Sequence, residues 1–204
     1  SYSDPYKLKG DSNYFYNPYP IEDNLKHLTG RIGIIGSGLS AIDSFRYLIR
    51  NGHKKVYVLS RSGEMPAVRG THFDIEPQHF TLEAALQYER DGLIPLEKLL
   101  GLFKLEMEAQ QVDWSLFERK TDRPEIDLKY DLEHPDSVGK LQYLITDLEE
   151  TFKILFKYLS RKDKRTFLKE YHPYINGNHS PMPSYGAAEI LSLIHISEPT
   201  RRTP

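Results

Sequence analysis

Apolar and polar residues follow a strand, helix and strand pattern between residues 31 and 61. The apolar run Ile32–Ile35 predicts a short strand buried on both faces, as a parallel sheet requires. From Leu39 to Ile49 the apolar positions recur at helical spacing, and Val56–Leu59 predicts a second strand. The pattern therefore predicts one β-α-β unit near the start of the chain.

A Gly-x-Gly-x-x-Ala turn lies between the first predicted strand and the helix. Gly36 would allow a sharp turn, and Gly38 would leave room for a pyrophosphate to approach the backbone. Ala41 takes the place of a third glycine and is small enough for close packing of helix and strand. Because free N–H groups at a helix start bind phosphate, this framed turn predicts nucleotide binding.

The end of the second predicted strand favours NADP(H) over NAD. An NAD site usually places an acidic residue about 20 residues after the glycines, where it binds the ribose 2′-hydroxyl. This chain instead has Ser60 and Arg61, a hydroxyl and a guanidinium suited to a 2′-phosphate. The alternative is that Arg61 is an ordinary solvated residue.

Helical spacing dominates the rest of the chain. Helices are predicted from Thr81 through Tyr88 with a stop at Gly92, from Pro95 to Met107, over Val138–Leu159, over Asp163–Tyr171 and from Ser184 onward. Three segments are predicted to be irregular: a loop at Gly63–Gln78, a charged connector at Asp122–Asp136 and a turn-rich loop over the segment HPYINGNHSPMP.

These elements predict an α/β fold in which a Rossmann-type unit is interrupted by a mainly helical insertion and is incomplete at both ends. The expected parts are a connector over residues 1–30, a nucleotide-binding unit over 31–70, a helical insertion covering substrate over 71–190 and a tail over 191–204. The chain opens without methionine, and about thirty residues precede the first strand, so we expect sequence to be missing upstream.

The tail has an unusual origin. Its residues LSLIHISEPTR match a translation of the transposon-end adaptor used in sequencing libraries. We therefore expect Leu191 to Pro204 to be non-native and the natural sequence to stop near Ile190.

Composition limits the classes of binding partner and the cellular compartment that we expect. The net charge of −2 gives no basic field for nucleic acid or an anionic membrane, so we expect neither as a partner. The absence of cysteine excludes disulfides and thiolate metal sites and is typical of a reducing compartment. With no apolar run of membrane length, a cytoplasmic location is expected.

Few residues are candidates for a catalytic role. His172 and His179 flank a group of tyrosines and asparagines that could contact a substrate or nicotinamide, although a polar loop bonding to itself is the favoured interpretation, because turns recruit these residues for backbone reasons alone. Glu149 and Glu150 are expected on a solvated helix face without an acid-base role, and Asp43 is expected to be structural. No metal site is expected.

The segments GIIGSGLSAID and VYVLSRSGEMP resemble bacterial FAD/NAD(P)-binding proteins, which are flavin-dependent oxidoreductases. The resemblance extends more loosely over most of Tyr14 to Ile190. It implies an FAD-binding domain upstream, with residues 1–30 leading from it, and a second glycine turn for NADPH, as in flavin monooxygenases. By this resemblance the pyrophosphate is held by Gly36, Ser37, Gly38, Leu39, Ser40 and Ala41, and the ribose phosphate by Ser60 and Arg61.

The resulting hypothesis is the NADPH-binding part of an FAD-dependent oxidoreductase acting on a small molecule. Two alternatives remain at this point: a flavin-free NADP dehydrogenase, and a non-enzymatic nucleotide-sensing or interaction domain. An upstream Gly-x-Gly-x-x-Gly unit in the full gene would favour flavin.

Overall fold

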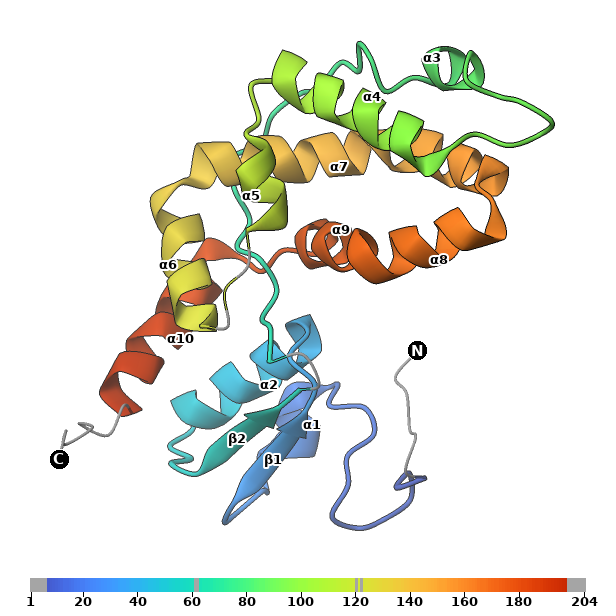
Figure 1. Ribbon diagram of the computed structural model, residues 1–204. Helices are drawn as coiled ribbons and strands as arrows, with labels where there is room; N and C mark the ends of the chain where they lie inside the picture. The colour runs from blue at the N-terminus through green and yellow to red at the C-terminus, as the bar shows by residue number, and fades with distance from the viewer. Residues whose placement is uncertain (1–6, 61–62, 120, 122, 198–204) are drawn as a thin grey trace, which may run out of the picture. The chain divides into compact units, whose positions relative to one another are not determined.

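The computed structural model describes residues 7–60, 63–119, 121 and 123–197. The chain divides into two compact units, Ser1–Met65 and Pro66–Pro204. The described residues form ten α-helices, one short 3-10 helix and a single two-stranded sheet, so helix dominates an α/β chain (Figure 1).

The first unit contains the β-α-β arrangement that the sequence predicts. Strand β1 spans Ile32–Ile35, helix α2 spans Leu39–Arg50 and strand β2 spans Val56–Leu59. The strands are parallel, with Ile32 opposite Val56 and Ile35 opposite Leu59. A short helix, α1 (Ile21–Leu25), lies within the predicted connector. The β-α-β core is thus confirmed, whereas among the described residues the sheet has no further strands to form a full Rossmann sheet.

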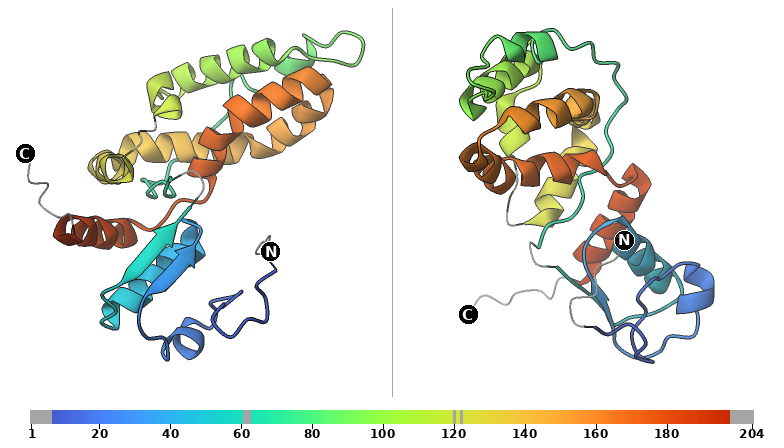
Figure 2. Two further views of the ribbon diagram at one scale, coloured as in Figure 1. Left: turned by 60° about the horizontal axis from the view of Figure 1, so that its bottom comes forward. Right: turned by 90° about the vertical axis from the view of Figure 1, so that its right-hand side faces the viewer.

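One face of this sheet is open, which corrects the expectation of strands buried on both faces. Helix α2 packs against one face and buries Ile42 and Leu48 (Figure 2). On the other face Ile35, Tyr57 and Leu59 are 65%, 53% and 62% exposed. Side chains alternate across a strand, so a helix on one side covers only every second residue.

The second unit is built from helices. They are α3 (Leu82–Leu86), α4 (Leu96–Ala109), α5 (Trp114–Glu118), α6 (Pro124–Glu133), α7 (Pro135–Leu155), a 3-10 turn (Phe156–Tyr158), α8 (Arg161–Glu170), α9 (His172–His179) and α10 (Ser184–Ser197). The expected helices after Pro95 and over 163–171 are confirmed as α4 and α8. Helix α10 begins at Ser184 and continues beyond Ile190 into the adaptor-like segment.

Two segments predicted to be irregular are helical instead. Asp122–Asp136 contains α6, and His172–His179 forms α9. The prediction of irregular structure treats proline as a helix breaker. Pro124 and Pro135, however, lie in the first turns of α6 and α7, where the missing N–H has no intrahelical partner and the fixed φ favours the helix. These prolines therefore start helices.

Two predicted helix boundaries also shift. The Thr81 hydroxyl caps α3 by accepting from the Ala84 N–H at 3.2 Å, but the helix ends at Leu86 rather than Tyr88. The long helix α7 begins at Pro135 and ends at Leu155, before the 3-10 turn.

The core of the helical unit lies along α7. Four of its side chains are almost fully buried against residues of α4, α5 and α8: Leu141, Leu144, Ile145 and Leu148. Burial of such a stripe supplies most of the stabilisation of an amphipathic helix. Figure 2 shows α4 and α7 side by side with α8.

The loop before α3 crosses the start of α7 at very short range. A Cβ built on Gly139 would lie 1.9 Å from the Thr71 carbonyl oxygen, and one built on Gly70 would lie 2.2 Å from the Gly139 nitrogen. The crossing is held by hydrogen bonds from the Gly70 N–H to Gln142 Oε1 at 3.0 Å and from Gln142 Nε2 to the Val68 carbonyl at 2.7 Å. Both glycines are therefore required by packing.

A buried carboxylate joins α4 to the segment before α3. Glu106 is fully buried, and its Oε2 accepts from the backbone N–H groups of Gln78, His79 and Phe80 at 2.8, 2.6 and 2.9 Å. Its Oε1 accepts from Gln110 Nε2 at 2.9 Å. Burial opposes ionisation of Glu106, but these hydrogen bonds outweigh it and hold its pKa below the ordinary value.

Candidate functional site

The glycine turn lies at the carboxyl ends of both strands. Gly36 follows β1 directly and has a φ of +108°, a conformation that favours glycine. Its N–H donates to the Leu59 carbonyl at 2.7 Å, which places the turn beside the end of β2. Ligands of parallel α/β sheets bind at this edge, outside the carboxyl ends of the strands.

Helix α2 begins in this turn with its N-terminus uncapped by any described side chain. Gly38 is the N-cap residue, and its carbonyl accepts from the N–H groups of Ala41 and Ile42 at 2.9 and 3.0 Å. The first turn carries no acidic side chain, and Leu39 is 37% exposed. The positive end of the helix dipole therefore faces an exposed edge without a carboxylate to neutralise it.

Space is open in front of the turn. A Cβ built on Gly38 would meet nothing within 4 Å, and its φ of −73° is one that any residue adopts. Ser37, Ser40 and Ala41 lie beside it in the same turn. The absence of a side chain at Gly38 is thus not required by folding, and it leaves the backbone accessible to a ligand.

The residues expected at the ribose are only partly described. Ser60 follows β2, is exposed and accepts the Gly63 N–H on its Oγ at 2.9 Å. It lies next to Leu59, whose carbonyl holds the glycine turn, so the structure brings Ser60 to the same edge as Gly36. Arg61 lies outside the described residues.

Asp43 has a structural partner in the same unit. Its Oδ2 accepts from the Tyr19 hydroxyl at 2.8 Å, which ties α2 to the segment before α1. This contact agrees with the structural role expected from the sequence.

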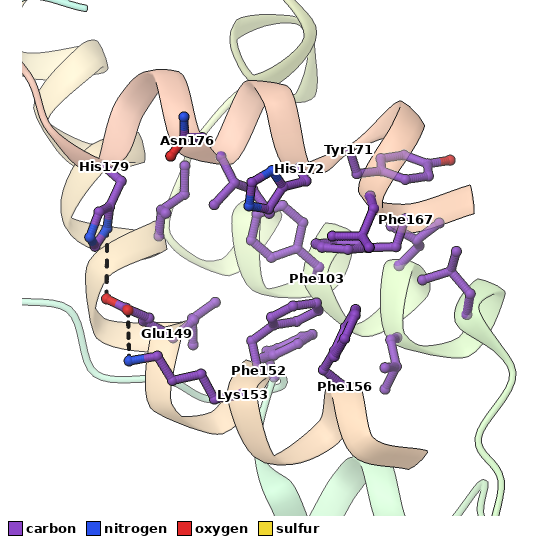
Figure 3. A pocket seen from close by; sticks show the side chains of 18 of the residues that line it. Phe103, Glu149, Phe152, Lys153, Phe156, Phe167, Tyr171, His172, Asn176 and His179 are labelled. Carbon is purple, nitrogen blue, oxygen red and sulfur yellow. Dashed lines mark ion pairs between the residues drawn. The ribbon is translucent and has the colours of Figure 1, made fainter. Parts of the chain in front are cut away.

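A second candidate site lies within the helical unit. A cavity of about 380 Å³ opens between α4, α7, α8 and α9 (Figure 3). Its walls are mainly aromatic and aliphatic: Phe80, Leu96, Leu99, Leu100, Phe103, Phe117, Ile145, Leu148, Phe152, Phe156, Phe167, Leu168, Tyr171 and Ile175. The polar lining residues come from two facing helices: Glu149 and Lys153 from α7, and His172, Asn176 and His179 from α9.

The charged side chains at the cavity lie in ion pairs. Glu149 lies 2.7 Å from Lys153 Nζ through Oε1 and 3.6 Å from His179 Nδ1 through Oε2. Lys153 also contacts Glu150 at 2.7 Å. The Lys153 hydrogen bond holds the pKa of Glu149 below its ordinary value, and the two glutamates raise the pKa of Lys153 to about 12.

Sequence reasoning found only part of this pocket. It identified His172 and His179 but placed them in a loop, whereas both lie on α9 and line the cavity. It placed Glu149 on a solvated face, whereas Glu149 is half-buried and lines the cavity. A signal was present, because residues 145, 148, 149, 152, 153 and 156 recur at helical spacing and put Glu149 and Lys153 on the apolar stripe.

Comparison with protein-family models, curated proteins and solved structures finds no match to this chain. Over the residues that the structure describes, no helix combines the length and apolar character needed to cross a membrane. In the same part of the chain no group of three His, Asp or Glu side chains is arranged to hold a metal ion.

Proposed function

We propose that this chain is the NADP(H)-binding portion of an FAD-dependent oxidoreductase. In the proposed reaction the nicotinamide delivers a hydride to flavin, and a small molecule is the final substrate, as in monooxygenases. The observation that carries the proposal is the parallel β1-α2-β2 unit, whose glycine turn opens onto an uncapped helix N-terminus.

The residues present fit a dinucleotide. The N-terminus of α2 would attract the pyrophosphate through its dipole and its backbone N–H groups. Gly38 would allow the phosphates close to the backbone, because no Cβ occupies the open space there. Ala41 would keep helix and strand closely packed.

Selectivity for the phosphorylated coenzyme is proposed to come from the end of β2. The residues after Leu59 are Ser60, Arg61 and Ser62, none of which is a carboxylate that would repel a 2′-phosphate. Arg61 supplies the charge-assisted hydrogen bond in this proposal, and Ser60 supplies a hydroxyl from the same edge.

The flavin partner would complete the proposed enzyme. A two-stranded parallel sheet with an open apolar face is a small part of a nucleotide-binding fold, since parallel sheets are ordinarily covered on both faces. Further strands and a flavin-binding domain would supply that cover. The chain's own role would be to bind and orient the nicotinamide coenzyme.

Calorimetric titration with NADPH tests the proposal through Gly38→Ala. The new methyl group meets nothing in the protein, so the variant should fold normally and yet bind NADPH at least about tenfold more weakly, or about 1.4 kcal/mol. Gly33→Ala in β1 is the matched control, because its Cβ also meets nothing, and it should bind as the parent chain does. Equal affinities for all three proteins, or no NADPH binding by the parent chain, would refute the proposal.

A further inference from the structure

The helical cavity has the size and position of a ligand site. Its volume of about 380 Å³ falls within the range of small-molecule pockets, roughly 300 to 1,000 Å³. Every lining residue lies between Phe80 and His179, inside one compact unit, so the cavity is formed by helices of that unit together with Phe80 from the loop before α3. It is also separate in sequence from the glycine turn.

The walls favour an aromatic occupant. Phe152 and Phe167 lie with ring centroids 4.5 Å apart, and Phe103 and Phe117 lie 5.3 Å apart at an angle of 69°. Phenylalanine rings tilted against one another in this way offer both ring faces and ring edges to the cavity, and another aromatic ring packs favourably against either. Water gains few hydrogen bonds from these walls, so replacing it with an apolar molecule is favourable.

The polar side of the cavity favours a neutral occupant. Glu149 is paired with Lys153, and Lys153 is shared between Glu149 and Glu150, so both charged side chains that line the cavity from α7 already have partners. Figure 3 shows His172 and Asn176 on α9, across the cavity from Glu149 and Lys153 on α7; both are exposed, and both can donate or accept a hydrogen bond. These groups can meet one polar substituent of a ligand.

We infer that this cavity binds a neutral aromatic molecule with one hydrogen-bonding substituent directed toward the polar side chains that α7 and α9 contribute to its lining. The site is independent of the proposed coenzyme site, because its residues and its chemistry belong to the helical unit alone. The proposal of NADPH binding and the inference of a ligand in this cavity can therefore be refuted independently.

The single tryptophan of the chain provides a local readout. Trp114 lies with its ring centroid 5.1 Å from that of Phe117 and 6.0 Å from that of Phe103, and both phenylalanines line the cavity. A probe in the cavity would thus lie within range of energy transfer from Trp114. N-phenylnaphthylamine is a suitable probe, because it is neutral and aromatic and carries one N–H donor.

The experiment titrates the full chain with N-phenylnaphthylamine and follows both probe emission and quenching of Trp114. We expect saturable binding with energy transfer. The anionic anilinonaphthalenesulfonate should bind more weakly, since Lys153 is already paired with Glu149 and Glu150 and is not available to its sulfonate.

Two variants locate the binding. Leu168→Glu places a charge on a half-exposed cavity residue, and Ile175→Phe fills part of the cavity, so each should weaken probe binding by about tenfold. Leu105→Glu is the matched control, because Leu105 is similarly exposed but lies outside the cavity, and it should change affinity less than about twofold.

Absence of saturable binding would overturn the inference, as would equal affinity in the parent chain and both cavity variants. The inference would also be overturned if the chain failed to bind the probe and instead self-associated in a way that Leu168→Glu abolishes. That result would assign the cavity to contact with a second copy of the chain. NADPH titration of the same proteins reports on the coenzyme site separately.

Discussion

Replacing Glu106 with glutamine tests how the helical unit is held together. The buried carboxylate accepts four hydrogen bonds, three of them from backbone N–H groups. A hydrogen bond to a charged group contributes about 1.5 to 3 kcal/mol, against about 0.5 to 1.5 for a neutral one. In Glu106→Gln all four hydrogen bonds become weaker, but a charge no longer has to be buried, which offsets part of the loss. The expected net decrease in the free energy of unfolding is about 2 to 4 kcal/mol.

Unfolding followed by Trp114 fluorescence measures this loss in the correct unit, because the single tryptophan packs against the helical core. At about 3 °C per kcal/mol, the unfolding temperature should fall by roughly 6 to 12 °C. Glu108→Gln on the same helix is the control. Because Glu108 is exposed, this substitution should change the free energy of unfolding by no more than about 0.5 kcal/mol.

The pH dependence gives a second, independent check. The pKa of Glu106 is lower in the folded state than in the unfolded state, so its stabilisation is present above the unfolded pKa. That stabilisation disappears as the pH falls through the folded pKa. The difference between parent and Glu106→Gln should therefore be largest near pH 7 and shrink on acidification toward about pH 3. A difference that is absent, or constant with pH, would refute the reasoning.

Three further predictions concern the coenzyme, the loop crossing and the tail. Arg61→Ala should weaken NADPH binding by about 1 to 3 kcal/mol in calorimetry and leave NADH nearly unaffected, and equal losses would contradict the proposed phosphate contact. Gly139→Ala should cost about 3 kcal/mol or more in thermal unfolding, because its Cβ meets backbone, whereas Gly101→Ala, whose Cβ meets nothing, should be slightly stabilising; similar effects would be inconsistent with the crossing. Deleting Leu191–Pro204 should leave the unfolding temperature unchanged if the tail is non-native, and a marked drop would argue against that origin.

Local patterns were sufficient for the β-α-β unit. Its strands are short apolar runs, its helix has an apolar stripe and its turn begins with Gly36, so each element depends on residues within a few positions of one another. The positive φ of Gly36 follows from the same local requirement. These features could be predicted because no distant partner decides them.

Tertiary contacts decided the rest. The apolar spacing along α6 and α9 is only weakly helical. Both segments form helices because each has a proline in its first turn and because apolar side chains from each, such as Tyr130 and Ile175, pack against the core. The pairing of Glu149 with His179 joins residues thirty positions apart, and Glu106 binds a segment that lies 26 to 28 positions before it.

Sequence alone therefore determined the glycine turn between β1 and α2 and the mainly helical character of the residues after β2. Only the folded chain determined the aromatic cavity, the buried carboxylate and the open sheet face. The physical reason is that a strand, a turn or a helix stripe is encoded by spacing along the chain, whereas a cavity or a buried charge exists only where distant elements pack together.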